Sequence, residues 1–186
     1  NDNFDSIFFT DNSTDLNDID VFIITVPTPL KDNNEPELSF IMKASIMVGK
    51  TIRLNINRKN NQIVIFESTV FPGATEEICA PLIAQYSGKN FNCETYENSF
   101  YCGYSPERIN PGDKEKTIDS IVKVTSGSNK RISVWVDNLY KSFITAGTFN
   151  VSSIKVAEAA KIIENTQRDI NIALVNELSI LFKKMN

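Results

Sequence analysis

The segment at residues 21–30 reads VFIITVPTPL and decides the fold class. Its first six residues, Val21–Val26, are β-branched or aromatic, and a strand that is apolar on both faces belongs inside a parallel sheet covered by helices. Pro27 and Pro29 lack backbone N–H donors, so they end the strand sharply. The pattern predicts a rigid loop at the carboxyl end of a buried strand, which is where open α/β sheets bind ligands.

The flanking sequence predicts the rest of an α/β fold. Three further short apolar runs end in turn or polar residues and are typical of strands: Ile7–Thr10, Ile63–Phe66 and Ile121–Thr125. Helical patterns occupy Leu38–Ile56, Pro72–Tyr86 and Lys130–Phe143. The alternation of strands and helices predicts a doubly wound parallel sheet with flanking helices and right-handed crossovers. Residues 87–103 are polar and irregular, and they indicate no element.

A different pattern begins near residue 150. From Ser152 to Met185 apolar residues recur at steps of three and four, and no glycine or proline interrupts them. The pattern predicts one helix that is longer than a typical globular helix and that leaves the sheet domain to span or dimerise. We therefore divide the chain into residues 1–150 and residues 151–186.

Composition excludes several classes of function. The net charge of −4 provides no basic field that could hold nucleic acid or an acidic membrane. The chain has no histidine and its 3 cysteines show no CxxC spacing, so we expect neither a metal site nor a histidine-based triad. The cysteine usage and the 41% hydrophobic content are typical of a soluble protein of the reducing cytoplasm.

Two loops that follow predicted strands have side chains suited to a ligand. Thr28 is the one side chain of VPTPL able to hydrogen-bond a ligand, although a lone PTP is more often only a stiff turn. In the loop ESTVFPG, Ser68 and Thr69 could meet a ribose or an amide, or could simply cap the next helix. Glu76 and Glu77 in the first turn of that helix argue against a phosphate at its N-terminus.

Two further segments carry charged side chains. The loop GYSPERINPG holds Glu107 and Arg108 side by side, and these could handle a proton and an anionic group, or could serve solubility alone. On the long helix Lys161, Asn165 and Arg168 are spaced i, i+4, i+7, so they line one face. The usual meaning of such charges is a solvated face. Acidic residues nearby could form ordinary helix pairs: Glu158, Glu164 and Asp169.

Four segments together resemble one enzyme family. These segments are VPTPL, ESTVFPGATEE, GYSPERINPGDK and SIKVAEAAKIIENTQRDINIALVNEL. In sequence and in spacing they are similar to the UDP-glucose/GDP-mannose dehydrogenase family, and the resemblance runs from about Phe9 to Met185. The sequence of these segments most resembles the branch of UDP-N-acetylglucosamine/galactosamine 6-dehydrogenases, the Vi-antigen type. The resemblance implies the later half of a Rossmann-like NAD-binding domain at residues 1–150. It also implies that residues 151–186 begin a central helical domain that forms a homodimer.

The resemblance also implies a reaction and a role for each site residue. The family oxidises the C6 hydroxyl of a UDP-sugar, here a UDP-N-acetylhexosamine, to a carboxylate in two NAD-dependent steps for surface polysaccharide synthesis. A cysteine-bound intermediate joins the steps. Lys161 and Asn165 would stabilise the oxyanion, and Glu107 assisted by Thr69 would orient the hydrolytic water. Thr28 and Thr69 would contact NAD. The expected substrate contacts are Glu107, Arg108, Ile109, Lys161, Asn165 and Arg168.

Several alternatives stay open. Pro111 stands where UDP-glucose dehydrogenases usually have a second glutamate, which favours the N-acetylhexosamine branch, but a C-terminal domain mostly sets substrate choice. The other interpretations are a UDP-glucose or GDP-mannose dehydrogenase, a nucleotide-sugar-binding module that catalyses no reaction, and a structural helix that dimerises. The GxGxxG-type fingerprint and the GGHCIGVDPYY-like cysteine segment are absent. We therefore expect an internal fragment without activity of its own, and the gluco or galacto epimer is not decided.

Overall fold

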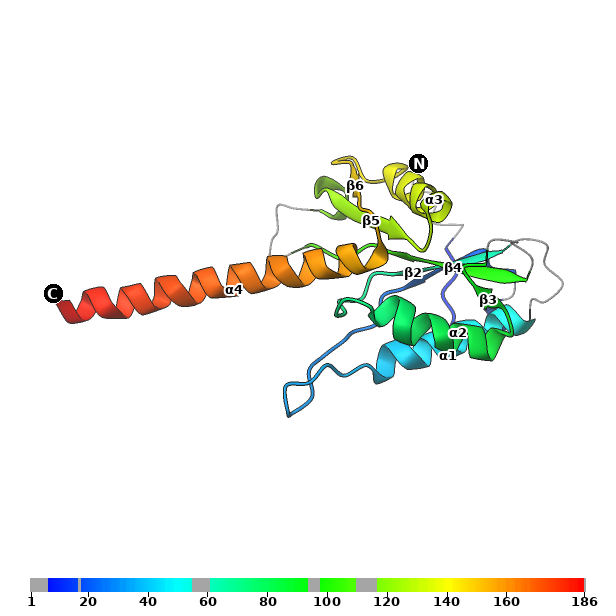
Figure 1. The fold of residues 1–186 in the computed structure, drawn as a ribbon, viewed down its shortest axis with the longest axis horizontal. Coiled ribbons are helices and arrows are strands. Elements are labelled where there is room, and N and C mark those ends of the chain that lie inside the picture. The colour runs from blue at the N-terminus through cyan, green and yellow to red at the C-terminus, as the bar shows by residue number, and fades with distance from the viewer. Residues whose placement is uncertain (1–6, 17, 55–60, 94–97, 110–116, 186) are drawn as a thin grey trace.

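The computed structural model describes residues 7–16, 18–54, 61–93, 98–109 and 117–185, which form a sheet domain and one long projecting helix (Figure 1). Within these residues the sheet has the strand order β1-β2-β4-β5-β6, with β3 paired to β4. All pairings are parallel except that of β4 with β5. The predicted α/β class is confirmed. The strands are β1 (Val21–Ile24), β2 (Gln62–Phe66), β3 (Asn90–Phe91), β4 (Ser99–Tyr104), β5 (Lys123–Gly127) and β6 (Thr148–Asn150).

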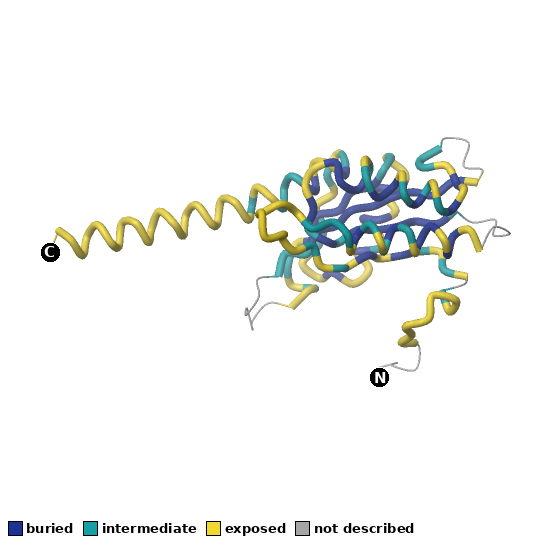
Figure 2. The backbone as a smooth tube through the Cα atoms, turned by 90° about the horizontal axis from the view of Figure 1, so that it is seen from below, coloured by how far each residue is buried: buried dark blue, intermediate teal, exposed yellow. Residues whose placement is uncertain are grey.

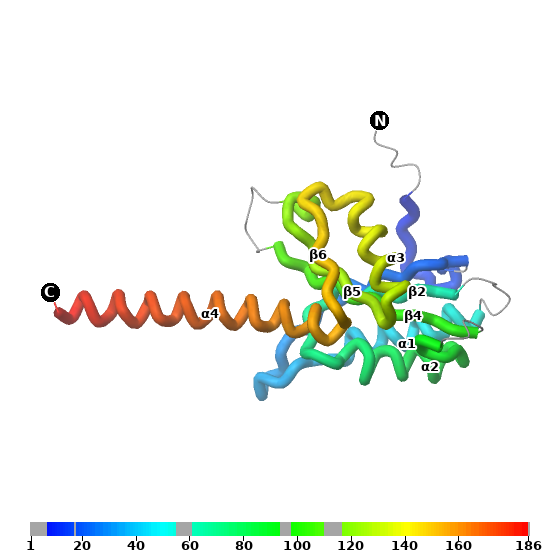
Figure 3. Tube along the Cα trace, turned by 45° about the horizontal axis from the view of Figure 1, so that its top comes forward, coloured from blue at the N-terminus to red at the C-terminus, as the bar shows by residue number. Residues whose placement is uncertain are grey.

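Helices cover both faces of the sheet (Figures 1 and 3). Alternating residues of β2 show the two sides, because Val64 and Phe66 belong to one core cluster while Ile63 and Ile65 belong to the other. The first cluster lies against α1 and α2, and the second lies against α3. Two short 3-10 turns, η2 (Ser13–Leu16) and η4 (Ile118–Ser120), complete the domain. The helices are α1 (Ser39–Leu54), the π-helical turn η3 (Thr75–Cys79), α2 (Ala80–Ser87) and α3 (Lys130–Lys141).

The structure corrects three strand predictions. Ile7–Thr10 is not a strand, because this run is exposed, with Phe9 88% exposed, and it pairs with no other strand of the described residues. The segment considered irregular, residues 87–103, contains β3 and all but the last residue of β4, a fully buried strand that includes Cys102. β4 was missed because small and polar residues separate its aromatic ones. One of them, Gly103, is required by packing, since a Cβ there would lie 2.8 Å from Val136 Cγ2. β5 begins two residues later than predicted.

The predicted long helix is confirmed as α4 (Ile154–Met185), which has 32 residues. Only Ile154, Ala157 and Glu158 of this helix are buried, and every described residue from Asn165 onward is exposed. Figure 2 shows the contrast between the buried strands of the domain and the exposed length of α4. In the part of the chain that the structure describes, no helix combines the length and apolar character that a membrane crossing needs.

A buried carboxylate fastens α4 to the domain. Glu158 is 0% exposed and accepts hydrogen bonds from the backbone N–H groups of Gly73, at 2.6 Å, and Thr75, at 3.0 Å. Gly73 has a φ of 98°, a conformation that favours glycine, in the turn before η3. Burial raises the pKa of the Glu158 carboxyl, while the hydrogen bonds act in the opposite direction. Assigning Glu158 to an ordinary helix pair was therefore wrong, because the side chain points inward.

Replacing Glu158 should destabilise the domain. Glu158→Ala leaves two buried N–H groups without an acceptor, so we expect the free energy of unfolding to fall by about 2 to 6 kcal/mol. Glu158→Gln keeps one acceptor oxygen and should give a smaller loss. Glu177 is an exposed residue of the same helix, so the free energy of unfolding of Glu177→Ala should stay within about 0.5 kcal/mol of that of the unsubstituted chain. Urea denaturation followed by Trp135 fluorescence measures all three, and equal stability of Glu158→Ala and Glu177→Ala would contradict the anchor.

Candidate active site

Three loops meet at one edge of the sheet. Because β1, β2 and β4 are parallel, the residues that follow each strand emerge at the same edge. These are the loops at residues 25–30, 67–74 and 105–109. The first turns of α4 pack against β4 and β5, so this helix runs past the same edge (Figure 1). Four segments that are far apart in the sequence therefore border one space.

A pocket of about 460 Å³ occupies this space between the loops and α4. It brings together most of the residues that the sequence singled out, from the second loop, the third loop and α4. The i, i+4, i+7 spacing of Lys161, Asn165 and Arg168 places all three on the same wall. The lining residues are Thr69, Glu107, Ile109, Lys161, Asn165, Arg168, Asp169 and Ile172.

Glu107 is held by its own loop. Its Oε1 accepts the backbone N–H groups of Arg108, at 2.6 Å, and Ile109, at 2.7 Å. Its Oε2 lies 3.8 Å from Lys123 Nζ, and 41% of the side chain is exposed. One carboxylate oxygen is thus fixed by the backbone, while the side chain still reaches the pocket. A carboxylate in this position is suited to accept a proton from a ligand or from water.

Lys161 lines the pocket from α4, on the same wall as Arg168. Partial burial lowers the pKa of Lys161, while the nearby carboxylates of Glu164 and Glu107 act in the opposite direction. Lys161 therefore shares the pocket with Glu107 rather than pointing into bulk solvent. A lysine with a lowered pKa is suited to hydrogen-bond an oxygen that develops negative charge.

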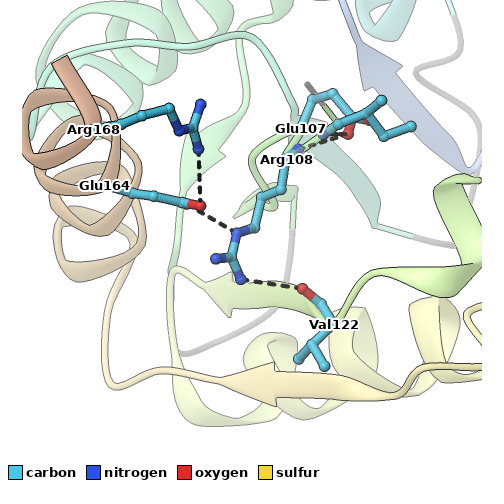
Figure 4. A network of polar contacts seen from close by, with 6 residues as sticks. Glu107, Arg108, Val122, Glu164 and Arg168 are labelled. Carbon is cyan, nitrogen blue, oxygen red and sulfur yellow. Dashed lines mark hydrogen bonds and ion pairs between the residues drawn. The ribbon is translucent and has the colours of Figure 1, made fainter. Parts of the chain in front are cut away.

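Arg108 is tied to α4 rather than lining the pocket. Its Nε lies 3.0 Å from Glu164 Oε2, and its Nη1 donates to the carbonyl of Val122 at 3.3 Å (Figure 4). The other oxygen of Glu164 lies 3.3 Å from Arg168 Nη2. The hydrogen bond from Arg108 lowers the pKa of Glu164. The pair of Glu164 with Arg168 is the ordinary helix pair that the sequence suggested, but its link to Arg108 was not expected.

A second pocket of about 470 Å³ adjoins the first and shares Thr69 and Glu107 with it. Its walls are the loops after β1 and β2, which two hydrogen bonds of 2.6 Å join. Thr28 Oγ1 donates to the carbonyl of Thr69, and Ser68 Oγ donates to the carbonyl of Val26. The hydroxyl of Thr28 thus fixes the neighbouring loop. The lining residues are Thr25, Val26, Pro27, Thr28, Glu67, Ser68, Thr69, Glu107 and Ile118.

Sequence reasoning missed three residues beside these pockets. Glu67 lines the second pocket, accepts the hydroxyl of Tyr140 and lies 3.3 Å from Lys123 Nζ. Neither Tyr140 nor Lys123 belongs to any of the four segments. Lys123 did carry a signal, because it lies inside the apolar run Ile121–Thr125 that predicted a strand. A charged side chain at such a position needs a partner of opposite charge.

Comparisons with known proteins agree with the four sequence segments. Residues 3–144 match the model of the UDP-glucose/GDP-mannose dehydrogenase family, NAD binding domain. The chain belongs to this family. UDP-N-acetyl-D-glucosamine 6-dehydrogenases of Pseudomonas aeruginosa and Salmonella typhi are 56% and 51% identical to it over 95% and 96% of the chain. A solved UDP-D-ManNAc dehydrogenase of Pyrococcus horikoshii has a TM-score of 0.79 and 34% identity, and the match covers 92% of this chain and 38% of that one.

The chain spans 39% of the length of each of the two curated relatives. The family assignment that the four segments suggested is confirmed, and so is the NAD-binding domain. Pro111, the residue used to separate the branches, lies outside the described residues.

In this dehydrogenase-family domain, the helix that begins after β2 offers no phosphate site at its N-terminus. The carboxylate of Glu158 already accepts the N–H groups of Gly73 and Thr75. The sequence predicted the same exclusion from Glu76 and Glu77, whereas in the structure Glu158 occupies the site. A phosphate there would replace hydrogen bonds that are already made, and would meet a negative charge.

The three cysteines of this dehydrogenase-family chain lie away from the first pocket. Cys79 and Cys102 are 0% exposed, so both are core residues. Burial raises the pKa of the Cys79 thiol to about 11 and that of Cys102 well above its ordinary value. Cys93 is partly exposed, between β3 and β4. The buried two are therefore neutral thiols at physiological pH and not nucleophiles.

Proposed function

We propose that this chain forms the later half of the NAD-binding domain and one wall of the active site of a nucleotide-sugar 6-dehydrogenase. The enzyme would oxidise the C6 hydroxyl of a UDP-N-acetylhexosamine to a carboxylate, in the cytoplasm, for a surface polysaccharide. The observation that carries the proposal is the single pocket shared by Glu107, Lys161 and Asn165. Identity of 56% and 51% to UDP-N-acetyl-D-glucosamine 6-dehydrogenases supports this substrate class over UDP-glucose.

In the proposed first oxidation the C6 hydroxyl oxygen loses its proton and carbon C6 loses a hydride. Lys161 and Asn165 lie one helical turn apart on the pocket wall, so both can donate hydrogen bonds to the same oxygen. Such donors stabilise the negative charge that develops on the oxygen in the transition state. The proton of the C6 hydroxyl passes to Lys161, because a lowered pKa favours the neutral amine that accepts it. NAD, when bound, accepts the hydride.

In the proposed second half of the reaction Glu107 orients the water that releases the acid. Glu107 borders both pockets, and Thr69 does the same from the loop after β2. A water between them would contact a carboxylate that accepts its proton and a side-chain hydroxyl that fixes its position. The covalent intermediate requires a cysteine thiolate, and the cysteines of this chain are not placed to supply one.

The second pocket suits the ribose and amide groups of NAD. Its lining includes the hydroxyl side chains of Thr28, Ser68 and Thr69, and these are neutral groups that can meet hydroxyls and carboxamides. Thr28 and Thr69 are the proposed NAD contacts. For the UDP-sugar, Ile109 and Arg168 line the first pocket directly. Arg108 joins Arg168 through Glu164, so we assign the two arginines to one positively charged rim.

The domain division and the oligomer belong to the same proposal. We assign residues 1–150 to the NAD-binding domain and residues 151–186 to the start of a helical domain that forms a homodimer. Support comes from the apolar residues that α4 exposes along its outer length, because contiguous apolar surface of this kind marks an interface. These residues are Ile163, Ile170, Leu174, Val175, Leu178 and Leu181.

The test uses a chimera in which this chain replaces the segment that it matches in the Pseudomonas aeruginosa relative. We expect the purified chimera to form NADH with UDP-N-acetylglucosamine or UDP-N-acetylgalactosamine faster than with UDP-glucose, measured by absorbance. The 186-residue chain alone should form none, because its cysteines lie away from the pocket. Preference for UDP-glucose would contradict the substrate class, and steady NADH formation by the chain alone would contradict the assigned need for another cysteine.

Lys161→Ala in the chimera should lower turnover far more than it weakens binding. A donor that acts mainly in the transition state contributes on the order of 10²–10³-fold to kcat. The measurements are kcat from initial rates and the Kd of the UDP-sugar from calorimetry. Lys183→Ala, an exposed lysine on the same helix, is the control and should leave both unchanged. Equal losses in kcat and in affinity would reduce Lys161 to a binding role.

Glu107→Gln in the chimera should slow the release of the acid in particular. The amide cannot accept the proton of the water, so a covalent adduct should accumulate on the protein. Intact-protein mass spectrometry after mixing with substrate and NAD detects this adduct. Glu177→Gln, at an exposed position of α4, is the matched control and should show no accumulation. If the Glu107→Gln protein turns over slowly but accumulates no adduct, Glu107 acts in the first oxidation instead.

A further inference from the structure

Lys123 has its charged end buried behind two carboxylates that border the pockets. It begins β5, and 3% of its side chain is exposed. Its Nζ lies 3.3 Å from Glu67 Oε2, 3.8 Å from Glu107 Oε2 and 5.3 Å from the centre of the Tyr140 ring. Within the described residues, this ammonium has no hydrogen-bond partner of ordinary geometry. It is therefore held by the charge of two carboxylates and the face of one ring.

Each carboxylate has its other oxygen fixed by a neutral donor. Glu67 Oε1 accepts the hydroxyl of Tyr140, and Glu107 Oε1 accepts the backbone N–H groups of Arg108 and Ile109. The remaining oxygen of each carboxylate is the one near Lys123. The lysine thus joins the end of β2 to the loop after β4, from behind both pockets. Removal of its charge would leave these two oxygens without their shared cation.

One cation lies beside both carboxylates. Both lie within 3.8 Å of one nitrogen atom, so they are close to each other as well. Like charges at such a distance, in partly buried surroundings, oppose each other, and one of them tends to keep a proton. A buried ammonium in turn is unfavourable unless opposite charges face it. The arrangement therefore stabilises three charges that would be costly one by one.

Other groups around Glu107 do not replace Lys123. Lys161 faces it from α4, but burial lowers the pKa of Lys161, and Glu164, Arg108 and Arg168 surround that lysine. Tyr140 faces it from α3, and burial together with Glu67 raises the pKa of the Tyr140 hydroxyl, so the ring stays neutral. Lys123 is thus the one buried cation among the charged groups described around Glu107.

We propose that Lys123 is a positioning residue, which keeps Glu67 and Glu107 ionised together and holds Glu107 at the boundary of the two pockets. The inference deepens the proposed function and rests on it where Glu107 orients water. Only an ionised carboxylate accepts a proton, so Lys123 sets the pH range in which Glu107 acts. Lys123 itself touches neither pocket, and its effect passes through Glu107.

The charge part of the proposal is measured on this 186-residue chain without any substrate. Glutamate carboxyl carbons are labelled with 13C and titrated by NMR, with Glu67→Gln and Glu107→Gln to assign the two signals. In Lys123→Met the titration midpoint of one of the two carboxyls should rise by about one pH unit or more. Lys123→Arg keeps the charge and should retain most of the parent behaviour. Circular dichroism checks that each variant is folded, and Lys123→Gln is a second uncharged variant.

A matched control separates this effect from the loss of any lysine. Lys141 forms an ion pair of 2.6 Å with Asp137 on α3, and Lys141→Met should leave the Glu67 and Glu107 signals unchanged. Unchanged signals of both carboxyls in folded Lys123→Met or Lys123→Gln overturn the proposal. A shift of the same size in Lys141→Met overturns it too, because the effect would then not depend on the contacts of Lys123.

The functional part is measured in the chimera. The acid limb of the pH profile of kcat should move to higher pH in Lys123→Met by about as much as the carboxyl titration, and Lys123→Arg should reverse most of this change. The KM for the UDP-sugar should not move, because Lys123 does not line the first pocket. A carboxyl titration that moves while the pH profile stays in place rejects the role in the reaction. An inactive parent chimera counts against the proposed function alone, since the titration still decides the charge part.

Discussion

The carboxylate of Glu158 accepts hydrogen bonds from the backbone N–H groups of Gly73 and Thr75, and the position of α4 depends on this contact. It is the one acidic side chain of the helix that is fully buried among the described residues, and Ile154 and Ala157 are buried beside it. The two amides would otherwise be orphaned at the start of a helix, at a cost of about 1–3 kcal/mol each. One side chain therefore satisfies a helix terminus and sets the direction of a second helix.

The pockets follow from this contact. Lys161 lies one turn beyond Glu158 and Asn165 one turn further, so the anchor brings both to the loops after β2 and β4. Hydrogen bonds also fix those loops. Thr28 and Ser68 hydrogen-bond across the first two, and Glu107 accepts two amides of its own segment. The residues at the edge of the sheet are thus held by backbone groups, which change little when neighbouring side chains do.

The sequence allowed prediction where one element carries its own pattern. β1 and β2 are continuous apolar runs and α1, α3 and α4 have clear periodicity, and the spacing on α4 correctly grouped three side chains on one face. β4 could not be predicted, because Gly103, which lies close to Val136 of α3, and the small residues of the strand leave no long apolar run. Contacts between segments distant in sequence were also beyond prediction. Glu158 with the Gly73 turn and Lys123 with Glu67 are of this kind, since no local pattern specifies which backbone or carboxylate a side chain meets.

Because α4 is long and is anchored at one end, a small rotation at Glu158 displaces its far end by much more than it displaces the residues near the anchor. From Glu158 to Met185 the helix extends for roughly 40 Å, whereas Lys161 lies only about 4.5 Å along the axis from the same fulcrum. A tilt of about 5° at the anchor would carry the distal end through roughly 3.5 Å but would move Lys161 by only about a tenth of that. Sub-ångström adjustments at the pocket are therefore magnified at the far end. Conversely, a contact that fixes the distal end to within about 1 Å would hold Lys161 to within about a tenth of that distance.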